Sequence, residues 1–495
     1  MQGRHAAFVA AIEGCWAAFI ASRRRMAPSS GTTASVALCT ALLAACAAVP
    51  PRTPPDPAAT AQAFAARRLD NLSPNLPPPA SGWDRAQWLN AALLLNPQLA
   101  EERARATAVA AGERTAAQIR NPTLNLFGEY ITAAAGGAAW LYGLSMDFLL
   151  QRPGDRSRAK RSAALETQAA QSDVAESIWQ VRTALRQSLL DVVYARDEAA
   201  LLQQLVAARE KLQESARANL DAGEIAGSEA LRTQLELSAA RQRLNQVLMQ
   251  DSEAQGRLAA AVGVPAAALD GVPLRWPQWD RIAALYPDLS GSIRQEALID
   301  RPDLVRALRE YDLAETTLQS EVARRWPEFH ITPGYAWDNG GVRENQLNET
   351  LHDNELGMSL ELPIFNRNEG PIGEAVARRE LAGKHLESIQ AGLFMQMEQA
   401  ERNWPRARLA WEDATAAAVL AQQRRQAEQR ALSAGASDRP TLLLAQAEAI
   451  ETQLLGLQAA YAAQQAFAAL EDAYRRPLEG PECAMPLSWR TEKTS

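Results

Sequence analysis

The sequence predicts a mainly α-helical fold with four β-strands, built from one helix, strand, strand and long-helix-hairpin unit that is used twice. Residues 88–262 and 293–476 are the two diverged copies. The repetition rests on proline pairs at one shared spacing and on glycines at matching places: Asn96-Pro97 and Asn121-Pro122 with Arg301-Pro302 and Trp326-Pro327, and Gly143 and Gly223 with Gly357 and Gly435.

Four segments alternate apolar and polar residues with period two, which is typical of strands because successive side chains point to opposite faces. We expect these strands at about 122–132, 139–150, 328–338 and 355–363. Their apolar faces are rich in aromatic residues, and their length of about 8 to 11 residues is close to what a tilted strand needs to cross a bilayer. Half-buried strands of a soluble sheet give the same alternation, so periodicity alone leaves both interpretations open.

Two long helices follow the strand pairs. The segment Asp155–Ala222 contains neither proline nor glycine, so a continuous helix there would be roughly 100 Å long. Apolar residues recur at seven-residue spacing over 178–206, which indicates coiled-coil packing. Its counterpart, 374–434, contains Pro405, which should bend it. Each long helix should turn at a glycine into a returning helix, at about 228–262 and 438–476.

The N-terminus has the layout of a signal peptide. Arg23-Arg24-Arg25 precedes the apolar run 34–45, which ends in small residues before Cys46. This arrangement resembles the lipobox of bacterial lipoproteins, whose cysteine is acylated, for example with palmitate. The alternative is an ordinary buried cysteine, but the basic flank favours lipidation. Ala47 stands where an aspartate marks inner-membrane retention in many such proteins, so we expect the outer membrane.

The distribution of proline indicates the remaining domain boundaries. After a signal peptide at 1–45, residues 46–85 are a proline-rich leader, which we expect to be extended and semi-rigid. Residues 264–291 are rich in proline and tryptophan and should pack around the middle of the helices. The two repeats then fill 86–263 and 292–476, and 477–495 form a C-terminal tail.

Together these features resemble the TolC family of outer-membrane efflux proteins. The resemblance covers about 86–476 and includes the run Leu362-Pro363-Ile364-Phe365-Asn366-Arg367-Asn368-Glu369-Gly370. This run is most similar to the branch paired with heavy-metal efflux pumps, although related runs occur in drug-efflux members. The resemblance implies a homotrimer with one twelve-stranded membrane β-barrel and an α-helical periplasmic tunnel. Four strands are too few to close a membrane barrel, which independently indicates an oligomer.

Motifs for catalysis, cofactors or nucleic acid are missing from the sequence. There is no glycine-rich phosphate loop and no Gly-x-Ser-x-Gly or His-Glu-x-x-His pattern. A net charge of -7 over 495 residues gives no support for nucleic-acid binding. His330, His352 and His385 are not at metal-ligand spacing, and Cys483 has no partner if Cys46 is acylated. We therefore expect no enzyme, cofactor, metal or disulfide, with His330 lining a lumen and His352 in a loop.

Two sets of candidate functional residues remain. By resemblance, the helix turns dock a periplasmic membrane-fusion adaptor that connects to an inner-membrane pump; the turn residues are Gly223, Glu224, Ser228, Gly435, Ser437 and Asp438. Where TolC carries a pair of gating aspartates, the matching residues are Thr441 and Leu444, which gives no support to an acidic gate. Four carboxylates on the polar strand faces should line the lumen: Glu129, Asp147, Asp338 and Glu361. Such rings favour cations, unless water and salt screen the field.

The sequence thus predicts an outer-membrane channel subunit of a tripartite efflux system, a passive export duct for metal cations or drugs from periplasm to exterior. The alternative is a periplasmic coiled-coil structural or adaptor lipoprotein whose strands form a soluble domain. The strand faces distinguish the two, because a soluble adaptor should not repeat an aromatic-rich outward face in four segments of membrane-crossing length.

Overall fold

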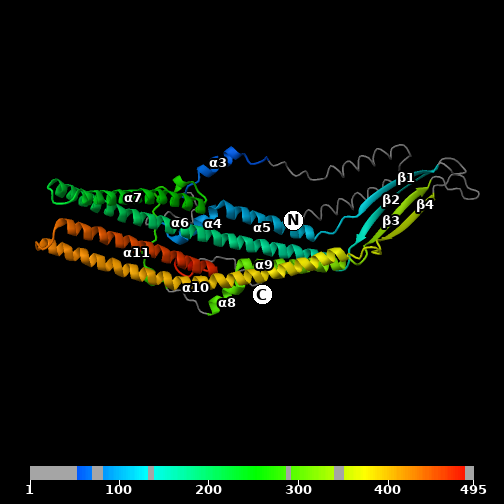
Figure 1. Ribbon diagram of the computed structural model, residues 1–495. Coiled ribbons are helices and arrows are strands. Elements are labelled where there is room, and N and C mark those ends of the chain that lie inside the picture. Colours follow the sequence, from blue (N-terminus) through cyan, green and yellow to red (C-terminus); the bar gives the residue numbers. More distant parts are fainter. Residues whose placement is uncertain (1–52, 70–81, 132–138, 286–290, 339–350, 485–495) are drawn as a thin grey trace, which may run out of the picture. The chain divides into compact units, whose positions relative to one another are not determined.

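The computed structural model describes residues 53–69, 82–131, 139–285, 291–338 and 351–484 (Figure 1). The chain divides into two units, Met1–Ala63 and Phe64–Ser495. The described part of the first unit contains the start of helix α3 (Pro57–Ala65), and the predicted lipidation residue Cys46 lies outside the described residues. The second unit contains both copies of the repeat.

One order of elements occurs twice in this unit (Figure 1). The first copy consists of α4 (Arg85–Leu95), α5 (Pro97–Ala116), β1 (Thr123–Ile131), β2 (Ala139–Leu150), α6 (Asp155–Asp221) and α7 (Gly227–Val262). The second copy consists of α8 (Gly291–Asp300), α9 (Pro302–Ala323), β3 (Phe329–Asp338), β4 (Leu351–Leu360), α10 (Glu369–Ser433) and α11 (Arg439–Tyr474). The described residues also form three short 3₁₀ helices, η2 (Ala266–Leu269), η3 (Ile282–Ala284) and η4 (Pro481–Ala484). The predicted class, mainly α with four strands from a duplicated unit, is confirmed.

The long helices are continuous. Helix α6 has 67 residues, and the middle of its predicted seven-residue stripe is buried, with Leu185 and Val192 at 2% and 1% exposure, whereas the end residues Ile178 and Val206 are half-buried. Helix α10 has 65 residues, begins five residues before the expected start, and continues through Pro405. Within the part of the chain that the structure describes, no helix combines the length and apolarity needed to cross a membrane.

Each repeat fastens the start of its second helix to the end of its last one. Asn96 precedes the proline that begins α5, and its side-chain amide donates to the carbonyl of Ala261 in α7 (2.9 Å). Arg301 holds the same place before α9 and donates to the carbonyl of Ala473 in α11 (2.6 Å). A residue before proline is disfavoured in helical conformation, so both N-cap residues are extended. The duplication therefore includes a tertiary contact as well as the elements.

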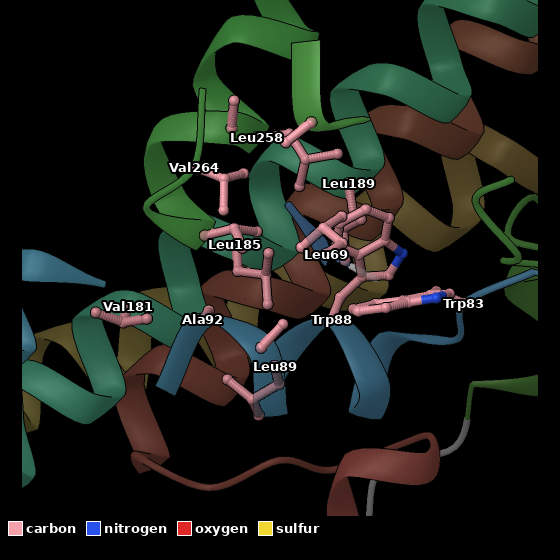
Figure 2. Close-up of a cluster of buried hydrophobic side chains, with 14 of the residues drawn as sticks. Leu69, Trp83, Trp88, Leu89, Ala92, Val181, Leu185, Leu189, Leu258 and Val264 are labelled. Atoms are coloured by element: carbon pink, nitrogen blue, oxygen red, sulfur yellow. The ribbon is translucent and has the colours of Figure 1, made fainter. Parts of the chain in front are cut away.

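A first hydrophobic cluster packs α4 against α6 and α7 (Figure 2). Trp83 and Trp88 have ring centroids 5.0 Å apart, and both side chains are buried. Leu69 of the proline-rich leader is also buried here, and Arg67 donates to the carbonyls of Leu95 (3.1 Å) and Gly263 (2.8 Å). The expectation of an extended leader is therefore wrong for its described part, which forms helix α3 and then packs into the core.

The segment between the repeats covers a second cluster on α11. Trp279 and Ile282 are buried, and the Trp279 indole donates to Asp197 of α6 (2.8 Å). The Gln464 amide of α11 donates to the Trp279 carbonyl (2.6 Å). The tryptophans thus hold this irregular segment against the helices, as their frequency in the sequence indicated.

A buried ionic cluster connects α6, α11 and the C-terminal segment. Arg182 lies 3.0 Å from Glu471 and 2.7 Å from Glu482, while Arg186 lies 3.2 Å from Glu471. Burial alone would raise the pKa of Glu471, but the two guanidiniums outweigh it and hold the pKa below its ordinary value of 4.5. The Leu478 N–H also donates to this carboxylate (2.8 Å). Glu471 is therefore charged at neutral pH although it is 1% exposed.

Strands and helices follow each other in one lateral order. The sheet order is β1-β2-β3-β4, and beside it α5 packs on α6, α6 on α9, and α9 on α10. Toward the helix turns the order becomes α7, α6, α11 and α10. The chain therefore forms a single wall in which each strand continues into its own helix.

Candidate functional site

The apolar faces of all four strands lie on one side of the sheet. Opposed residues in antiparallel strands share a face, so the register tests whether the alternation of the separate strands coincides. Leu150 is opposite Phe329, and Phe329 is opposite Leu360. The corresponding pair between β1 and β2 is Leu124 and Met146. The predicted apolar sets therefore form one continuous surface.

This apolar surface is exposed in the single chain. Leu126, Leu356 and Met358 are 75%, 71% and 72% exposed, and aromatic side chains join them. The Tyr130 and Trp140 rings lie 4.8 Å apart on the same face. A sheet with one large apolar face and one polar face is suited to contact with lipid hydrocarbon. An exposed apolar patch of this extent is rare on soluble monomers.

The opposite face carries three of the four predicted lumen carboxylates. Asp147 of β2 is 3.0 Å from the Nδ1 atom of His330 and 3.4 Å from the Thr332 hydroxyl, both on β3. Glu129 and Asp338 lie on either side of Leu141, which pairs with both. The structure thus brings acidic side chains from β1, β2 and β3 onto one surface, and gives His330 the polar-face position expected of it.

The fourth strand differs from the expectation at both ends. It begins at Leu351 because His352 and its neighbours pair with β3, although their sequence lacks alternation. It ends at Leu360, where its partner β3 begins, so Glu361 lies just beyond the strand and its N–H donates to Glu328 (3.4 Å). The predicted place of Glu361 on a strand face is therefore wrong for the single chain.

Sequence reasoning missed two acidic residues on the polar face. Asp353 is opposite Ala336, and Glu355 is opposite Gly334, so both share the face of Asp147. Only the strand register could have revealed them, because the alternation in this segment is weak. His352 is also a strand residue rather than a loop residue, and its ring stacks on Tyr335 with centroids 5.8 Å apart.

Both edges of the sheet are open among the residues that the structure describes, because β1 and β4 each pair with one strand only. An unpaired strand edge exposes backbone N–H and C=O groups. Such groups cannot face hydrocarbon. A sheet with an apolar face suited to lipid and two open edges therefore needs further strands to pair with those edges.

The two helix turns at the far ends of α6 and α10 share one backbone geometry. Gly223 and Gly435 have φ values of 75° and 73°, the left-handed region that favours glycine. After Gly223 the Glu224 N–H donates to the Asn219 carbonyl (2.8 Å), and after Gly435 the Ala436 N–H donates to the Ala431 carbonyl (2.8 Å). Apart from the glycine itself and its chain neighbours, no heavy atom of the described residues lies within 4 Å of a Cβ built on either glycine. Both turns are thus open to a partner.

The turns differ in how the returning helix starts. Asp438 caps α11 by accepting from the Thr441 N–H (2.8 Å), and hydrogen bonding to Thr441 lowers the pKa of Asp438. Ser437 donates to Glu428 (2.9 Å), whereas the start of α7 near Ser228 has no side-chain cap. The second turn is therefore more rigidly specified than the first.

The histidine, cysteine and acidic side chains form no metal site in the described ranges, where no group of three or more of them is arranged to hold an ion. Cys483 is a free, exposed cysteine in η4, and burial of part of its side chain raises the pKa of its thiol.

The comparisons with known proteins give one family match, which covers part of the chain. Residues 293–474 match the model of the family described as "Outer membrane efflux protein". This match covers the second repeat. No curated protein sequence matches the chain.

Solved structures share its fold. A membrane protein from Pseudomonas aeruginosa is 19% identical with a TM-score of 0.66, covering 79% of this chain and 93% of that one. The outer membrane protein VceC from Vibrio cholerae is 15% identical with a TM-score of 0.63, covering 80% and 97%. The MtrE outer membrane channel of Neisseria gonorrhoeae, in its open state, is 17% identical with a TM-score of 0.63, covering 79% and 88%.

Proposed function

We propose that this chain is the outer-membrane channel subunit of a tripartite efflux system, a passive export duct for metal cations or drugs from periplasm to exterior. The observation that carries the proposal is the sheet, which has one apolar exposed face, one acidic face and two open edges. Closing such sheets into a barrel places the apolar face against lipid and the acidic face around water. The shared fold with MtrE, itself an outer membrane channel, supports the proposal.

The assembly follows from the edges. A homotrimer joins three four-stranded sheets, removes every open edge and gives a barrel wide enough for an aqueous lumen. The helices α5, α6, α9 and α10 keep the lateral order of the strands, so they extend the same wall into a periplasmic tunnel. In this proposal the open turns at Gly223 and Gly435 meet a periplasmic adaptor, which connects the duct to an inner-membrane pump.

The alternative, a periplasmic coiled-coil lipoprotein, differs in what holds the protein to the membrane. A single acyl chain gives weak, reversible anchoring, whereas a barrel is integral. Membranes from cells that express the Cys46→Ser form are washed with alkaline carbonate. The channel should stay in the outer-membrane pellet without its lipid. Release of this form into the supernatant, with the unmodified protein retained, would establish the lipoprotein alternative.

The acidic face also sets the expected conductance. Carboxylates of three chains in one lumen favour cations over anions, and Asp147, Asp353 and Glu355 add to the ring of Glu129 and Asp338. Purified trimers in planar bilayers should conduct cations preferentially at low salt, where screening is weakest. Exchanging these five residues for Asn or Gln should remove the preference.

The matched control keeps the charge and changes the side-chain length. Glu129→Asp together with Asp338→Glu should retain cation preference in the same bilayers. Equal cation and anion permeability of the unmodified trimer would contradict the cation preference while leaving the duct itself in place.

A further inference from the structure

The two repeats pair their strands in the same register. Counted from the matching prolines and glycines, Leu124 corresponds to Phe329 and Met146 corresponds to Leu360. The first repeat pairs Leu124 with Met146, and the second pairs Phe329 with Leu360. The pair Tyr130 and Trp140 of the first repeat corresponds in the same way to the pair Tyr335 and Asn354 of the second. The duplication therefore preserves the ladder residue for residue.

A third ladder connects the repeats. The exit strand of the first repeat, β2, pairs with the first strand of the second repeat, β3. The two free edges belong to the equivalent strands of the two repeats. β4 is the second strand of the second repeat, as β2 is of the first repeat, and β1 is the first strand of the first repeat, as β3 is of the second. The contact between β2 and β3 is therefore a template, inside one chain, for the contact between β4 of one copy and β1 of the next.

We propose that β4 joins β1 of a neighbouring copy in the register copied from β2 and β3. Leu150 opposite Phe329 becomes Ile364 opposite Leu124 of the next copy, and Phe148 opposite Ile331 becomes Leu362 opposite Leu126. This inference rests on the proposed channel, and it specifies which backbone groups close the barrel. The transferred pairs put leucine and isoleucine side chains together on the apolar face.

The register requires β4 to lengthen on assembly. In the single chain β4 ends at Leu360, whereas its counterpart β2 continues to Leu150, the position equivalent to Ile364. Leu362 and Ile364 are 58% and 67% exposed, which is unfavourable for branched aliphatic residues unless lipid or a neighbouring strand covers them. The segment after Leu360 therefore carries exposed apolar side chains that a partner strand would cover.

Pro363 does not prevent this pairing. Alternate residues of a strand hydrogen-bond to opposite neighbours. The Glu361 N–H donates toward β3, to Glu328, so Pro363, two residues later, has its missing N–H on the same side. In an extended strand Leu362 and Ile364 would direct their N–H groups to the free edge. In the single chain the Ile364 N–H instead donates to the Leu362 carbonyl (2.8 Å), so pairing with a neighbouring copy must replace this bond. The proline therefore removes a donor only where β3 has already ended.

Disulfide cross-linking tests the register. Ser145 opposite Gly334 transfers to Ser359 opposite Glu129 of the next copy. Ser359 is two residues before Glu361, so its backbone N–H and C=O also point toward β3 and away from the neighbouring copy. Ser359 and Glu129 would therefore form a non-hydrogen-bonded pair, whose shorter Cα separation of about 4.5 Å suits a disulfide. In a Cys483→Ser background, Ser359→Cys with Glu129→Cys should convert most of the protein into covalent trimers on mild oxidation.

Two slipped pairs serve as matched controls. Ser359→Cys with Phe127→Cys, and Glu361→Cys with Glu129→Cys, place the thiols one diagonal step apart, about 7–8 Å. They should cross-link only at the background level of the single-cysteine variants. Higher yield in a slipped pair, or no cross-link in native trimers, would overturn the register and leave the channel proposal intact. Protein that stays monomeric in membranes by mass measurement would overturn both.

Discussion

Replacing Glu471 by glutamine should destabilise the helical wall more than any exposed charge change. The carboxylate accepts from Arg182 (3.0 Å) and the Leu478 N–H (2.8 Å), and it is the carboxylate nearest to Arg186 (3.2 Å). Glutamine has nearly the same shape, so the substitution removes charge without opening a cavity. It leaves one buried positive charge uncompensated, which costs about 3–5 kcal/mol.

The measurement is urea denaturation followed by far-ultraviolet circular dichroism, which reports the helices. The midpoint should fall clearly for Glu471→Gln and stay unchanged for Glu374→Gln, whose partner Arg378 is exposed. Adding Arg186→Gln to Glu471→Gln removes the positive charge that has lost its partner. The double variant should therefore lose less free energy of unfolding than the sum of the losses in the two single variants. A wild-type midpoint for Glu471→Gln would refute the electrostatic role of the cluster.

The same cluster sets a pH dependence with a definite sign. The folded pKa of Glu471 lies below its ordinary value of 4.5, so the charged carboxylate contributes stability that is fully present above about that pH. This stability is lost as the pH falls through the lower, folded pKa. The difference between wild-type and Glu471→Gln midpoints should therefore shrink on acidification below 4.5, and a constant difference would contradict the charged state of Glu471.

Three further predictions concern substitutions at glycines and at Cys46. Gly480→Ala should destabilise by about 1–3 kcal/mol in the same assay, because φ is +93° and a Cβ would overlap the buried Arg85 guanidinium; an unchanged midpoint would count against it. Cys46→Ser should abolish labelling with a radioactive fatty acid, and retained label would exclude acylation at this residue. Leucine at Gly223 and Gly435 should weaken adaptor pull-down while trimers still form, since both positions face open space; adaptor recovery at wild-type strength would argue against docking there.

Periodicity predicted the strands and their faces because each strand separates two unlike environments. Alternation alone identified which residues of β2 and β3 face apart, and the register then placed these faces together. Strand ends were less predictable because pairing decides them. Leu351 begins β4 only because Asp338 lies opposite, and Asp353 and Glu355 join the acidic face for the same reason.

The buried ionic cluster could not be predicted, because its members are far apart in the sequence. Arg182 and Glu471 lie 289 residues apart and meet only after α6 packs on α11. One signal was available: Arg182 and Arg186 are four residues apart beside the apolar stripe of α6, where solvated arginines are unexpected. Charge in such a stripe indicates a buried partner without naming it.

The duplication explains why one chain can build a continuous wall from two diverged sequences. The side chains differ between the repeats even where the contact is the same. Asn96 and Arg301 are different residues, and each donates to a backbone carbonyl near the end of the last helix of its repeat. What both repeats share is backbone geometry: the proline at the start of the second helix, the left-handed glycine at the turn and the strand register. Selection on backbone geometry tolerates side-chain divergence, because ladder hydrogen bonds do not depend on residue type. The closure that we propose needs this geometry to recur at the free edges, and β1 and β4 keep it there.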